Sequence, residues 1–305
     1  MNFLFQNYYE IKNGLSNKKV FRKTGKKLNK IIVDFSKDEK EFLNFLNSYN
    51  ILKKINISIP KIYEVYSKKK IIVMEDFGDN IFQNIIDDKG LYKLLKLGVD
   101  NLIIIQNSIL EDDLPKLEKY NYINLKKEIS EFVNYYIPYK KISDFSEEKF
   151  YQVWKKNYNT HNFEFNSFVH KDYEFINLIF INNKSLHLKC GIIDFQNAFI
   201  GFSGWDLFSI LENPRLDLTR EYNESLMKYF YENVNIAVSY DTFRNQYYLL
   251  NLARQTRLLG RWVKLYNQEN NKYLNFILST EKRIIACLGN IKDIKLRKMY
   301  EKYIM

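Results

Sequence analysis

Cysteine, proline and glycine are all scarce in this chain of 305 residues, which contains 2 Cys, 4 Pro and 10 Gly. The two cysteines, Cys190 and Cys287, lie far apart, with no C-x-x-C spacing and no paired histidine. This pattern argues against a disulfide framework and a zinc site, and it fits a reducing compartment. The few Pro and Gly residues exclude collagen-like and proline-rich low-complexity segments.

Long apolar runs are also lacking. No stretch approaches the roughly 18 apolar residues of a transmembrane helix. Residues 1–15 do not show the basic region and apolar stretch of a signal peptide. We therefore expect a cytoplasmic protein with no membrane partner.

Acidic residues are outnumbered, since 47 Lys and Arg against 36 Asp and Glu give a formal charge of +11. Such a balance suggests an anionic partner, which could be nucleic acid, membrane headgroups or a phosphate-bearing ligand. A codon bias toward Lys, Asn, Ile, Tyr and Phe would explain the same composition. No zinc-finger spacing, no RNA-recognition motif and no basic block longer than Lys68–Lys70 is present, so we expect no nucleic-acid partner.

The composition that remains is that of a globular protein, with 46% hydrophobic and 16% aromatic residues. Alternation and turn residues predict strands at 19–24, 30–35, 62–66 and 70–74, and 3.6-residue periodicity predicts a helix over 37–54. Residues 80–159 show mainly helical patterns, a hairpin is predicted from strands at 178–181 and 186–195, and helices follow Trp205. Because strands and helices segregate along the chain, the predicted class is α+β.

Two polar interruptions carry the chemistry. The stretch FVHKDYEFINLIF (168–180) sets His170, Asp172 and Asn177 in the order H-x-D-x-x-x-x-N. In GIIDFQNAFIG (191–201), Asp194 ends a buried strand, so a hairpin would bring it close to Asp172 and Asn177.

Carboxylate and amide oxygens suit Mg²⁺. In phosphoryl transfer one Asp orients or deprotonates the acceptor hydroxyl, while an Asn and a second Asp hold the metal. The alternative interpretation is that Asp172 and Asn177 cap turns and Asp194 ends a strand. We expect His170 to brace the loop by packing and hydrogen bonding and not to shuttle protons.

These motifs resemble those of the aminoglycoside phosphotransferase and choline kinase group of protein-kinase-like enzymes. VHKDYEFINLIF is similar to their catalytic loop and GIIDFQ to their metal-binding segment. The closest resemblance is to the bacterial anomeric kinases of N-acetylmuramate and N-acetylglucosamine. It extends to IIVMEDFGDNIF, to CGIIDFQNAFIGFSGWDLFSILENPRLDL and to NLARQTRLLGRWVKLYNQENNKYL, and it is weakest at the start of the chain.

The resemblance implies a bilobal protein-kinase-like fold that works as one functional domain. Residues 1–76 would form a small N-lobe with an antiparallel sheet and one main helix, and residues 77–305 a larger, mainly helical C-lobe. It also implies ATP and Mg²⁺ as cofactors, a small sugar as substrate and cell-wall sugar recycling as the setting. We expect a monomer.

By the same resemblance, Asp172 is the catalytic base, and Asn177 and Asp194 are the Mg²⁺ ligands. Glu75, Asp76 and Phe77 would form the hinge against which adenine lies. Asp206 would brace the catalytic loop from the helix that follows.

The chain departs from the pattern at the lysine that usually holds the nucleotide phosphates. The matching position on the third strand is Val33, followed by Asp34. Lys30 is our candidate for this role, and Lys18, Lys19 and Arg22 stay open as alternatives. The expected phosphate loop, GLSNKKVF, contains only Gly14.

Substrate contacts are assigned to Glu174, Gln196 and Arg254. Glu174 stands where many relatives carry a histidine, and it would bring negative charge close to the acceptor. Arg254, Arg257 and Arg261 share one face of a helix predicted over 246–265. They would form either a cationic wall for an anionic substrate or a solvated face with acidic neighbours.

Three functions follow as hypotheses. The first is a kinase of the anomeric hydroxyl of N-acetylmuramate or N-acetylglucosamine. The second is a kinase of an aminoglycoside, a choline-like compound or another small alcohol. The third, motivated by the missing lysine and the charge of +11, is a nucleotide-binding pseudokinase or a basic interaction protein.

Overall fold

The computed structural model describes residues 7–11, 18–24, 30–216, 218–268 and 271–304, and these form two compact units. The first unit combines the described residues of Met1–Glu118 with Phe168–Phe199. The second combines Lys119–Ser167 with the described residues of Ile200–Met305. Residues 25–29, which connect the strands predicted at 19–24 and 30–35, and the segment around Gly14 lie outside the described residues. The division into lobes 1–76 and 77–305 stays a prediction, because a compact unit is not by itself a functional lobe.

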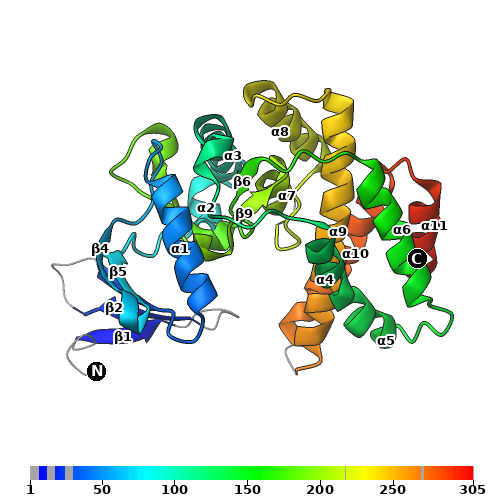
Figure 1. Ribbon diagram of the computed structural model, residues 1–305, viewed down its shortest axis with the longest axis horizontal. Coiled ribbons are helices and arrows are strands. Elements are labelled where there is room, and N and C mark those ends of the chain that lie inside the picture. Colours follow the sequence, from blue (N-terminus) through cyan, green and yellow to red (C-terminus); the bar gives the residue numbers. More distant parts are fainter. Residues whose placement is uncertain (1–6, 12–17, 25–29, 217, 269–270, 305) are drawn as a thin grey trace. The chain divides into compact units, whose positions relative to one another are not determined.

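An antiparallel sheet of five strands, in the order β1-β2-β3-β5-β4, forms within the described part of the first unit (Figure 1). Its strands are β1 (Tyr8–Ile11), β2 (Lys19–Lys23), β3 (Lys30–Asp34), β4 (Ile62–Tyr66) and β5 (Ile71–Glu75). Strands β2 to β5 confirm the four strands predicted from alternation. The short β1, with the sequence YYEI, shows no alternation and is not predicted.

The register of this sheet decides which side chains share a face. Val20 pairs with Val33, and Val33 pairs with Ile72, so these three side chains point to one face. Lys30 lies three residues from Val33 and pairs with Glu75, so both of these point to the opposite face. The opposite face carries a small apolar cluster, made of Ile32, Ile71, Val73, Tyr8, Phe21 and Tyr66.

Helix α1 (Glu39–Leu52) follows the third strand and confirms the helix predicted over 37–54. Its N-cap is Asp38, whose side chain accepts a hydrogen bond from the backbone N–H of Glu41 at 2.9 Å. The rings of Phe42 and Phe45 lie 6.2 and 5.4 Å from that of Phe35, so the helix is packed against the end of β3. Figure 1 shows α1 beside the strands.

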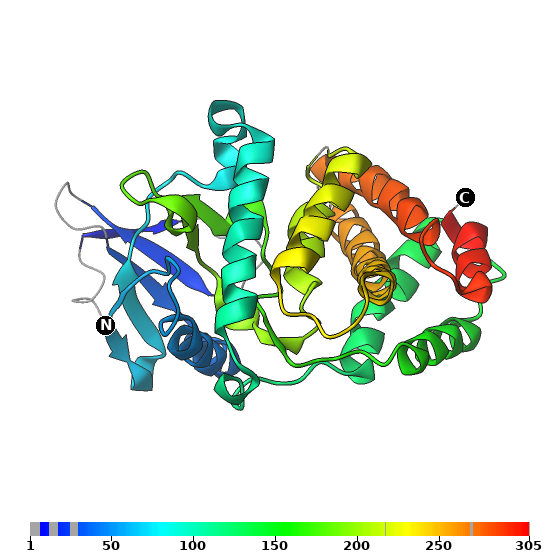
Figure 2. The same ribbon diagram turned by 90° about the horizontal axis from the view of Figure 1, so that it is seen from above.

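The rest of the first unit contains α2 (Ile86–Lys89), α3 (Leu91–Ser108) and a hairpin of β7 (Leu178–Phe180) and β8 (Cys190–Ile192). Figure 2 shows α3 next to this hairpin. Asn101 of α3 donates to the carbonyl of Cys190 at 3.1 Å, and the Tyr173 hydroxyl donates to the carbonyl of Gly98 at 3.0 Å. The helix therefore supports the hairpin from behind.

The strand predicted over 186–195 is wrong in its length. Residues Leu186–Lys189 form a 3₁₀ turn, and only Cys190–Ile192 pair as a strand. The turn starts at Leu186, which has a φ of 49° in the left-handed region and a side chain that is 79% exposed. Alternation of apolar residues does not reveal such a turn.

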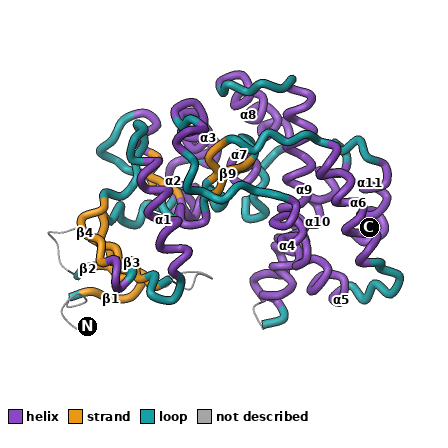
Figure 3. The backbone as a smooth tube through the Cα atoms, in the orientation of Figure 1, coloured by secondary structure: helices purple, strands orange, loops and turns teal. Residues whose placement is uncertain are grey.

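The second unit is built from helices, drawn in purple in Figure 3. They are α4 (Tyr122–Glu131), the π-helix Phe132–Tyr136, α5 (Ile137–Tyr139), α6 (Glu147–Thr160), α7 (Trp205–Leu211), α8 (Arg220–Asn233), α9 (Tyr240–Tyr266), α10 (Leu274–Leu288) and α11 (Ile294–Ile304). Helix α9 contains the helix predicted over 246–265 and is buried along most of its length. Its Gly260 touches the end of α4, where an added Cβ would lie 2.2 Å from the carbonyl carbon of Glu131.

Shorter segments complete the chain. The strands β6 (Ser167–Val169) and β9 (Phe199–Gly201) lie where the chain passes from one unit to the other. The remaining 3₁₀ turns are Ser67–Lys69, Phe82–Asn84, Glu111–Asp113, Phe175–Asn177, Phe195–Asn197 and Asn271–Tyr273. Both cysteines are buried and free.

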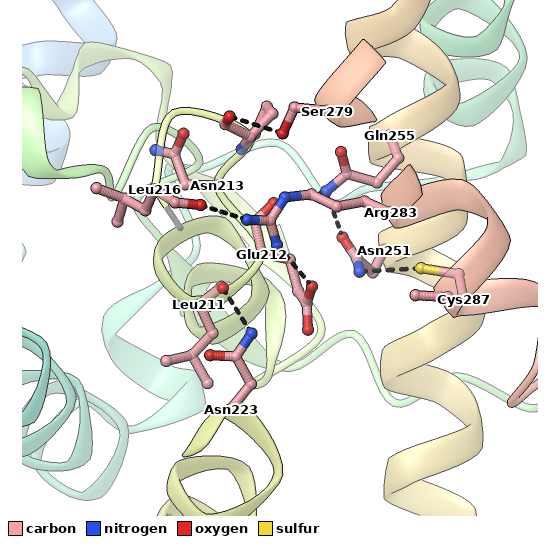
Figure 4. A network of polar contacts seen from close by, with 12 residues as sticks. Leu211, Glu212, Asn213, Leu216, Asn223, Asn251, Gln255, Ser279, Arg283 and Cys287 are labelled. Carbon is pink, nitrogen blue, oxygen red and sulfur yellow. Dashed lines mark hydrogen bonds and ion pairs between the residues drawn. The ribbon is translucent and has the colours of Figure 1, made fainter. Parts of the chain in front are cut away.

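A polar network is embedded among α7, α9 and α10 of the second unit (Figure 4). Arg283 pairs with Glu212 at 3.2 Å and donates to the carbonyl of Leu216 at 2.6 Å. Gln255 donates to the carbonyl of Glu212 at 2.8 Å, and Asn251 donates to the sulfur of Cys287 at 3.2 Å. Burial raises the pKa of Glu212, and Arg283 opposes this shift. The network explains how charged side chains are tolerated inside a helical core.

None of the helices in the described part of the chain is both long and apolar enough to cross a membrane.

Candidate functional site

The hairpin of the first unit brings the two polar interruptions together. Leu178 pairs with Ile192, and the next residue along, Ile193, donates its N–H to the carbonyl of Asn177 at 3.1 Å. Asp194 follows directly and adopts a left-handed conformation with a φ of 72°. The predicted convergence of Asn177 and Asp194 at one end of the hairpin is therefore present in the backbone.

Asp172 lies in a loop whose backbone is fixed from several sides. Its carbonyl accepts the side-chain amide N–H of Asn177 at 2.8 Å and the backbone N–H of Glu174 at 2.9 Å. Its carboxylate oxygen Oδ2 accepts a hydrogen bond from the side chain of Asn197 at 3.0 Å. Asp172 is partly buried as a residue, so it is held in place without being fully closed off from solvent.

His170 contacts the residue that follows the second strand of the same hairpin. Its Nε2 lies 2.9 Å from the carbonyl of Ile193, so this nitrogen must carry the proton and donate it. The side chain is 1% exposed, and burial lowers the pKa of His170 to about 4, although Asp172 opposes the shift. The ring is therefore neutral near pH 7, and its contact is the one that a bracing role requires.

Lys18, just before β2, lies against the segment that contains Asp194 and Gln196. Its ammonium forms an ion pair with Asp194 and donates to the side-chain oxygen of Gln196 at 3.2 Å. The side chain is 7% exposed and lies over the ring of Phe35. Burial lowers the pKa of Lys18 to about 8, while Glu41 and Asp172 act in the other direction.

Helix α1 is fastened to the same segment. Asn44 donates to the carbonyls of Gln196 and Ala198, at 2.5 and 2.9 Å. The rings of Phe45 and Phe195 are stacked with centroids 4.5 Å apart. Glu41, one turn earlier in α1, has a pKa raised mainly by burial and then by Asp38, and lowered by Lys18.

The predicted hinge residues lie at the end of β5 and directly after it, and Asp76 and Phe77 contact β2 and β8. Arg22 of β2 pairs with Asp76 at 2.6 Å and also with Asp79. Asp76 in turn accepts the backbone N–H of Gly78 at 2.9 Å. The ring of Phe77 packs so closely on Gly191 of β8 that an added Cβ there would lie 2.8 Å from it.

Two of the predicted cofactor contacts point elsewhere. The side chains of Lys30 and Glu75 project from the sheet face opposite Val33. The Lys30 ammonium lies 4.8 Å from the centre of the Tyr63 ring, and the Glu75 carboxylate accepts the N–H of Lys61 at 3.2 Å. The structure does not bring Lys30 to Asp172 or Asp194.

The substrate residues predicted from the sequence are buried. Glu174 is 8% exposed and Gln196 is 2% exposed. The side-chain oxygen of Gln196 accepts a hydrogen bond from Lys18. Arg254 belongs to the second unit, is 1% exposed and donates to the carbonyl of Ser209 at 3.4 Å.

The arginines of α9 do not as a set match either interpretation, the cationic wall or the solvated face. Arg254 is not solvated, and Arg261 pairs with Glu131 at 3.1 Å. Asp206, in the first turn of α7, is 2% exposed. The roles of Asp206 and Arg254 stay predictions.

The donor set at the hairpin end fits Mg²⁺. The amide nitrogen of Asn177 is committed to the carbonyl of Asp172, so its oxygen is the atom that would meet a cation. Asp194 supplies a carboxylate that already forms an ion pair with a cation, the ammonium of Lys18. Hard oxygen donors of this kind suit Mg²⁺. No group of three or more His, Cys, Asp and Glu that could hold a metal occurs among the described residues, so the set depends on Asn177 and on oxygens from a ligand.

Sequence reasoning misses Asn197, Glu41 and Asn44. Asn197 follows Asp194 by three residues, but nothing in the sequence links it to Asp172. Glu41 and Asn44 belong to a helix assigned only by its periodicity. Their roles depend on contacts across 25 to 154 positions of the chain, which only the folded structure reveals.

Comparisons with known proteins show what this chain is similar to. A family model described as the ecdysteroid kinase-like family matches residues 105–239. The N-acetylmuramate/N-acetylglucosamine kinase of Caulobacter vibrioides is 22% identical over 261 residues, which cover 81% of this chain and 71% of that protein. The enzyme of the same name from Neisseria meningitidis serogroup B is 20% identical and covers 83% of this chain and 79% of its own.

Solved structures show the same architecture. The GDP complex of aminoglycoside 2'-phosphotransferase-IIIa matches with a TM-score of 0.61 and 15% identity, covering 93% of this chain and 92% of that chain. The choline kinase LicA of Streptococcus pneumoniae matches with a TM-score of 0.57 and 16% identity, covering 90% and 92%. The chain therefore has the protein-kinase-like fold, and the predicted resemblance to aminoglycoside phosphotransferases and choline kinases is confirmed.

Proposed function

We propose that this protein is an ATP- and Mg²⁺-dependent phosphotransferase that acts on a hydroxyl group of a small molecule. The observation that carries the proposal is the position of Asp172. Its loop is tied to Asn177, its carboxylate is oriented by Asn197, and Asn177 is tied through Ile193 to the segment of Asp194. Hydrogen bonds thus link Asp172, Asn177 and the segment of Asp194 at one end of the hairpin, which supports roles for them as the base and the two metal ligands.

Asp172 would orient the acceptor hydroxyl and take its proton. Asn197 binds one carboxylate oxygen, which fixes the plane of the carboxylate. A fixed base lowers the barrier because the acceptor does not need to find its orientation during the reaction.

Asn177 and Asp194 would hold Mg²⁺ through their side-chain oxygens. When bound, the ion would neutralise the charge of the nucleotide phosphates. Asp194 has a left-handed backbone in the loop that follows β8, and its carboxylate forms an ion pair with Lys18.

The adenine would lie against the backbone that follows β5, at Glu75, Asp76 and Phe77. The support for this assignment is the order of the elements and the contact of Phe77 with Gly191. Arg22 keeps the hinge attached to β2 through Asp76, so that nucleotide and phosphate segments would keep their spacing.

For the acceptor we propose the anomeric hydroxyl of an amino sugar, N-acetylmuramate or N-acetylglucosamine, within cell-wall sugar recycling. The support comes from two relatives named for these sugars that cover most of this chain. The second candidate is another small alcohol, such as an aminoglycoside or a choline-like compound, because the fold matches enzymes of these names. The cytoplasmic location and the monomeric state stay predictions.

A substrate panel tests the proposal. Purified protein with ATP and Mg²⁺ should release ADP when N-acetylmuramate or N-acetylglucosamine is added. Aminoglycosides and choline in parallel wells decide between the two acceptor classes. Binding of ATP without ADP release from any acceptor would instead indicate a nucleotide-binding pseudokinase.

Asp172→Asn is the decisive variant. It keeps the size of the side chain and its contact with Asn197, so the fold should survive, but it removes the base. We expect turnover to fall by about a hundredfold or more, in the range of general-base contributions, with an unchanged melting temperature. Full activity in this variant would remove Asp172 from the mechanism.

A further inference from the structure

The position on β3 where the sequence pattern leads us to expect a phosphate-binding lysine carries no lysine. Val33 is 2% exposed and pairs with Val20 and Ile72. Lys30 points from the other face of the same strand. A cation for the nucleotide phosphates must therefore come from another element.

Lys18 lies on the correct face. Strand alternation puts residues two positions apart on the same side, and Val20 shares the face of Val33. Two residues before Val20, Lys18 directs its ammonium to Asp194 and Gln196. It is thus already in contact with the segment proposed to hold the metal.

The other cations named by the sequence are engaged elsewhere. Lys19 lies near Glu10 at 3.5 Å, on the exposed side of the hairpin of β1 and β2. Arg22 is held by Asp76 and Asp79 of the hinge. Lys30 lies over Tyr63. Among these four candidates, only Lys18 touches the proposed metal site.

Glu41 of α1 supplies the second observation. Its carboxylate oxygen Oε2 is fully buried and has no hydrogen-bond partner within the described residues. A buried carboxylate oxygen needs a donor, and Lys18 is the cation that acts electrostatically on Glu41. A helix carboxylate is therefore placed to receive the ammonium if it leaves Asp194.

We propose that Lys18 is the residue that binds the nucleotide phosphates, in place of a lysine on β3. The inference rests on the proposed function. In the structure the ammonium neutralises Asp194. When Asp194 instead binds Mg²⁺, the ammonium of Lys18 turns to the phosphate oxygens of the nucleotide. The carboxylate of Glu41 then supports the ammonium from α1. A lysine just before β2 thus performs a task for which β3 carries only Val33.

Lysine labelling tests the assignment on the unaltered protein. An acyl-phosphate derivative of ATP transfers its acyl group to an amine next to the phosphates. The amine nitrogen attacks the acyl carbon, the bond from that carbon to the phosphate oxygen breaks, and ATP leaves. Peptide mass spectrometry should find the label on Lys18, and excess ATP should prevent it. ATP-sensitive labelling of Lys30, Lys19 or another lysine in place of Lys18 would overturn the inference.

Binding measurements give an independent answer. We compare Lys18→Gln, which keeps a hydrogen-bond donor but loses the charge, with Lys30→Gln as the matched control. Loss of a charge-assisted contact should weaken ADP and ATP binding by about tenfold to a hundredfold in Lys18→Gln. Adenosine, which lacks phosphates, should bind both variants as it binds the unaltered protein, and Lys30→Gln should bind all three ligands normally.

The outcomes separate the two levels of the argument. If Lys18→Gln binds ADP normally, or if it loses adenosine as strongly as ADP, the phosphate role is wrong while the kinase proposal stands. If the unaltered protein binds no nucleotide and takes no ATP-sensitive label, the kinase proposal itself fails.

Discussion

At the scale of single residues, the site depends on a few contacts that orient reactive groups without taking part in the chemistry. Asn197 binds the carboxylate of Asp172 at 3.0 Å, and Asn177 binds its carbonyl at 2.8 Å. One contact fixes the side chain and the other fixes the backbone. Removing them should affect orientation more than binding or folding.

Asn197→Ala tests this division. Because Asp172 would lose its orienting donor, we expect kcat to fall by about tenfold to a hundredfold. The KM for ATP and the melting temperature should stay close to those of the unaltered protein. Asn183→Ala, in the exposed tip between β7 and β8, is the matched control and should change none of these values. A rise in KM with unchanged kcat would place Asn197 in substrate binding.

His170 makes stability depend on pH. Its folded-state pKa of about 4 lies below its ordinary value of 6.5, so the unfolded chain takes up a proton at a higher pH than the folded one does. The stability that this neutral ring supports is therefore complete above pH 6.5 and is lost as the pH falls toward 4. The shift corresponds to about 3 kcal/mol over that window.

The measurement is the free energy of unfolding from pH 7 to pH 4.5, by urea denaturation. His170→Gln cannot titrate, so its curve should fall less steeply than that of the unaltered protein. Parallel curves would show that other groups cause the acid sensitivity.

At the scale of elements, close packing between helices limits which side chains a position can hold. Helix α9 approaches the end of α4 so closely at Gly260 that a Cβ would meet backbone atoms, which cannot move aside as a flexible side chain can. A methyl group there must push the two helices apart.

Gly260→Ala should therefore destabilise the second unit by about 1–3 kcal/mol, although alanine normally favours a helix over glycine. Gly289→Ala is the matched control, because its nearest atom would lie 3.5 Å away and φ there is −59°. Thermal unfolding should show a lower midpoint for the first variant and little change for the second. Equal midpoints would mean that the helices separate at no cost.

The elements also show what sequence patterns can and cannot predict. The strands β2 to β5 and helix α1 follow from alternation and periodicity, because half-buried elements repeat their apolar residues. The 3₁₀ turn at Leu186–Lys189 has no such repeat and is mistaken for a strand. The Asp172 loop is found because its residue types are unusual in an apolar stretch. Its partner Asn197 is not found, because the pairing exists only after the hairpin forms.

At the scale of the whole molecule, all residues assigned to catalysis, metal and nucleotide belong to the first unit. Of the substrate assignments, Glu174 and Gln196 also belong to the first unit, while Arg254 belongs to the second, as does the brace assigned to Asp206. The role of Arg254 can therefore be tested apart from nucleotide binding.

ATP with Mg²⁺ should stabilise the protein as a ligand that binds only the folded state. At a free concentration of about a hundred times Kd, the stabilisation is about 2.7 kcal/mol. Differential scanning fluorimetry should show a higher midpoint with ATP and Mg²⁺ and a smaller rise with adenosine. A substitution on α9 such as Arg254→Gln should keep the rise even where turnover is lost. No shift at saturating ATP would contradict nucleotide binding.

The first unit draws on two stretches of chain that are separated by Lys119–Ser167 of the second. During synthesis on the ribosome, β2, α1 and α3 emerge well before Phe195, on which Phe45 stacks, and before Cys190, which Asn101 contacts. The apolar surface of the early part of this unit therefore stays exposed until its last 32 residues, Phe168–Phe199, are synthesised. Slow translation between these stretches would expose the nascent chain to aggregation, so chaperone demand should peak there.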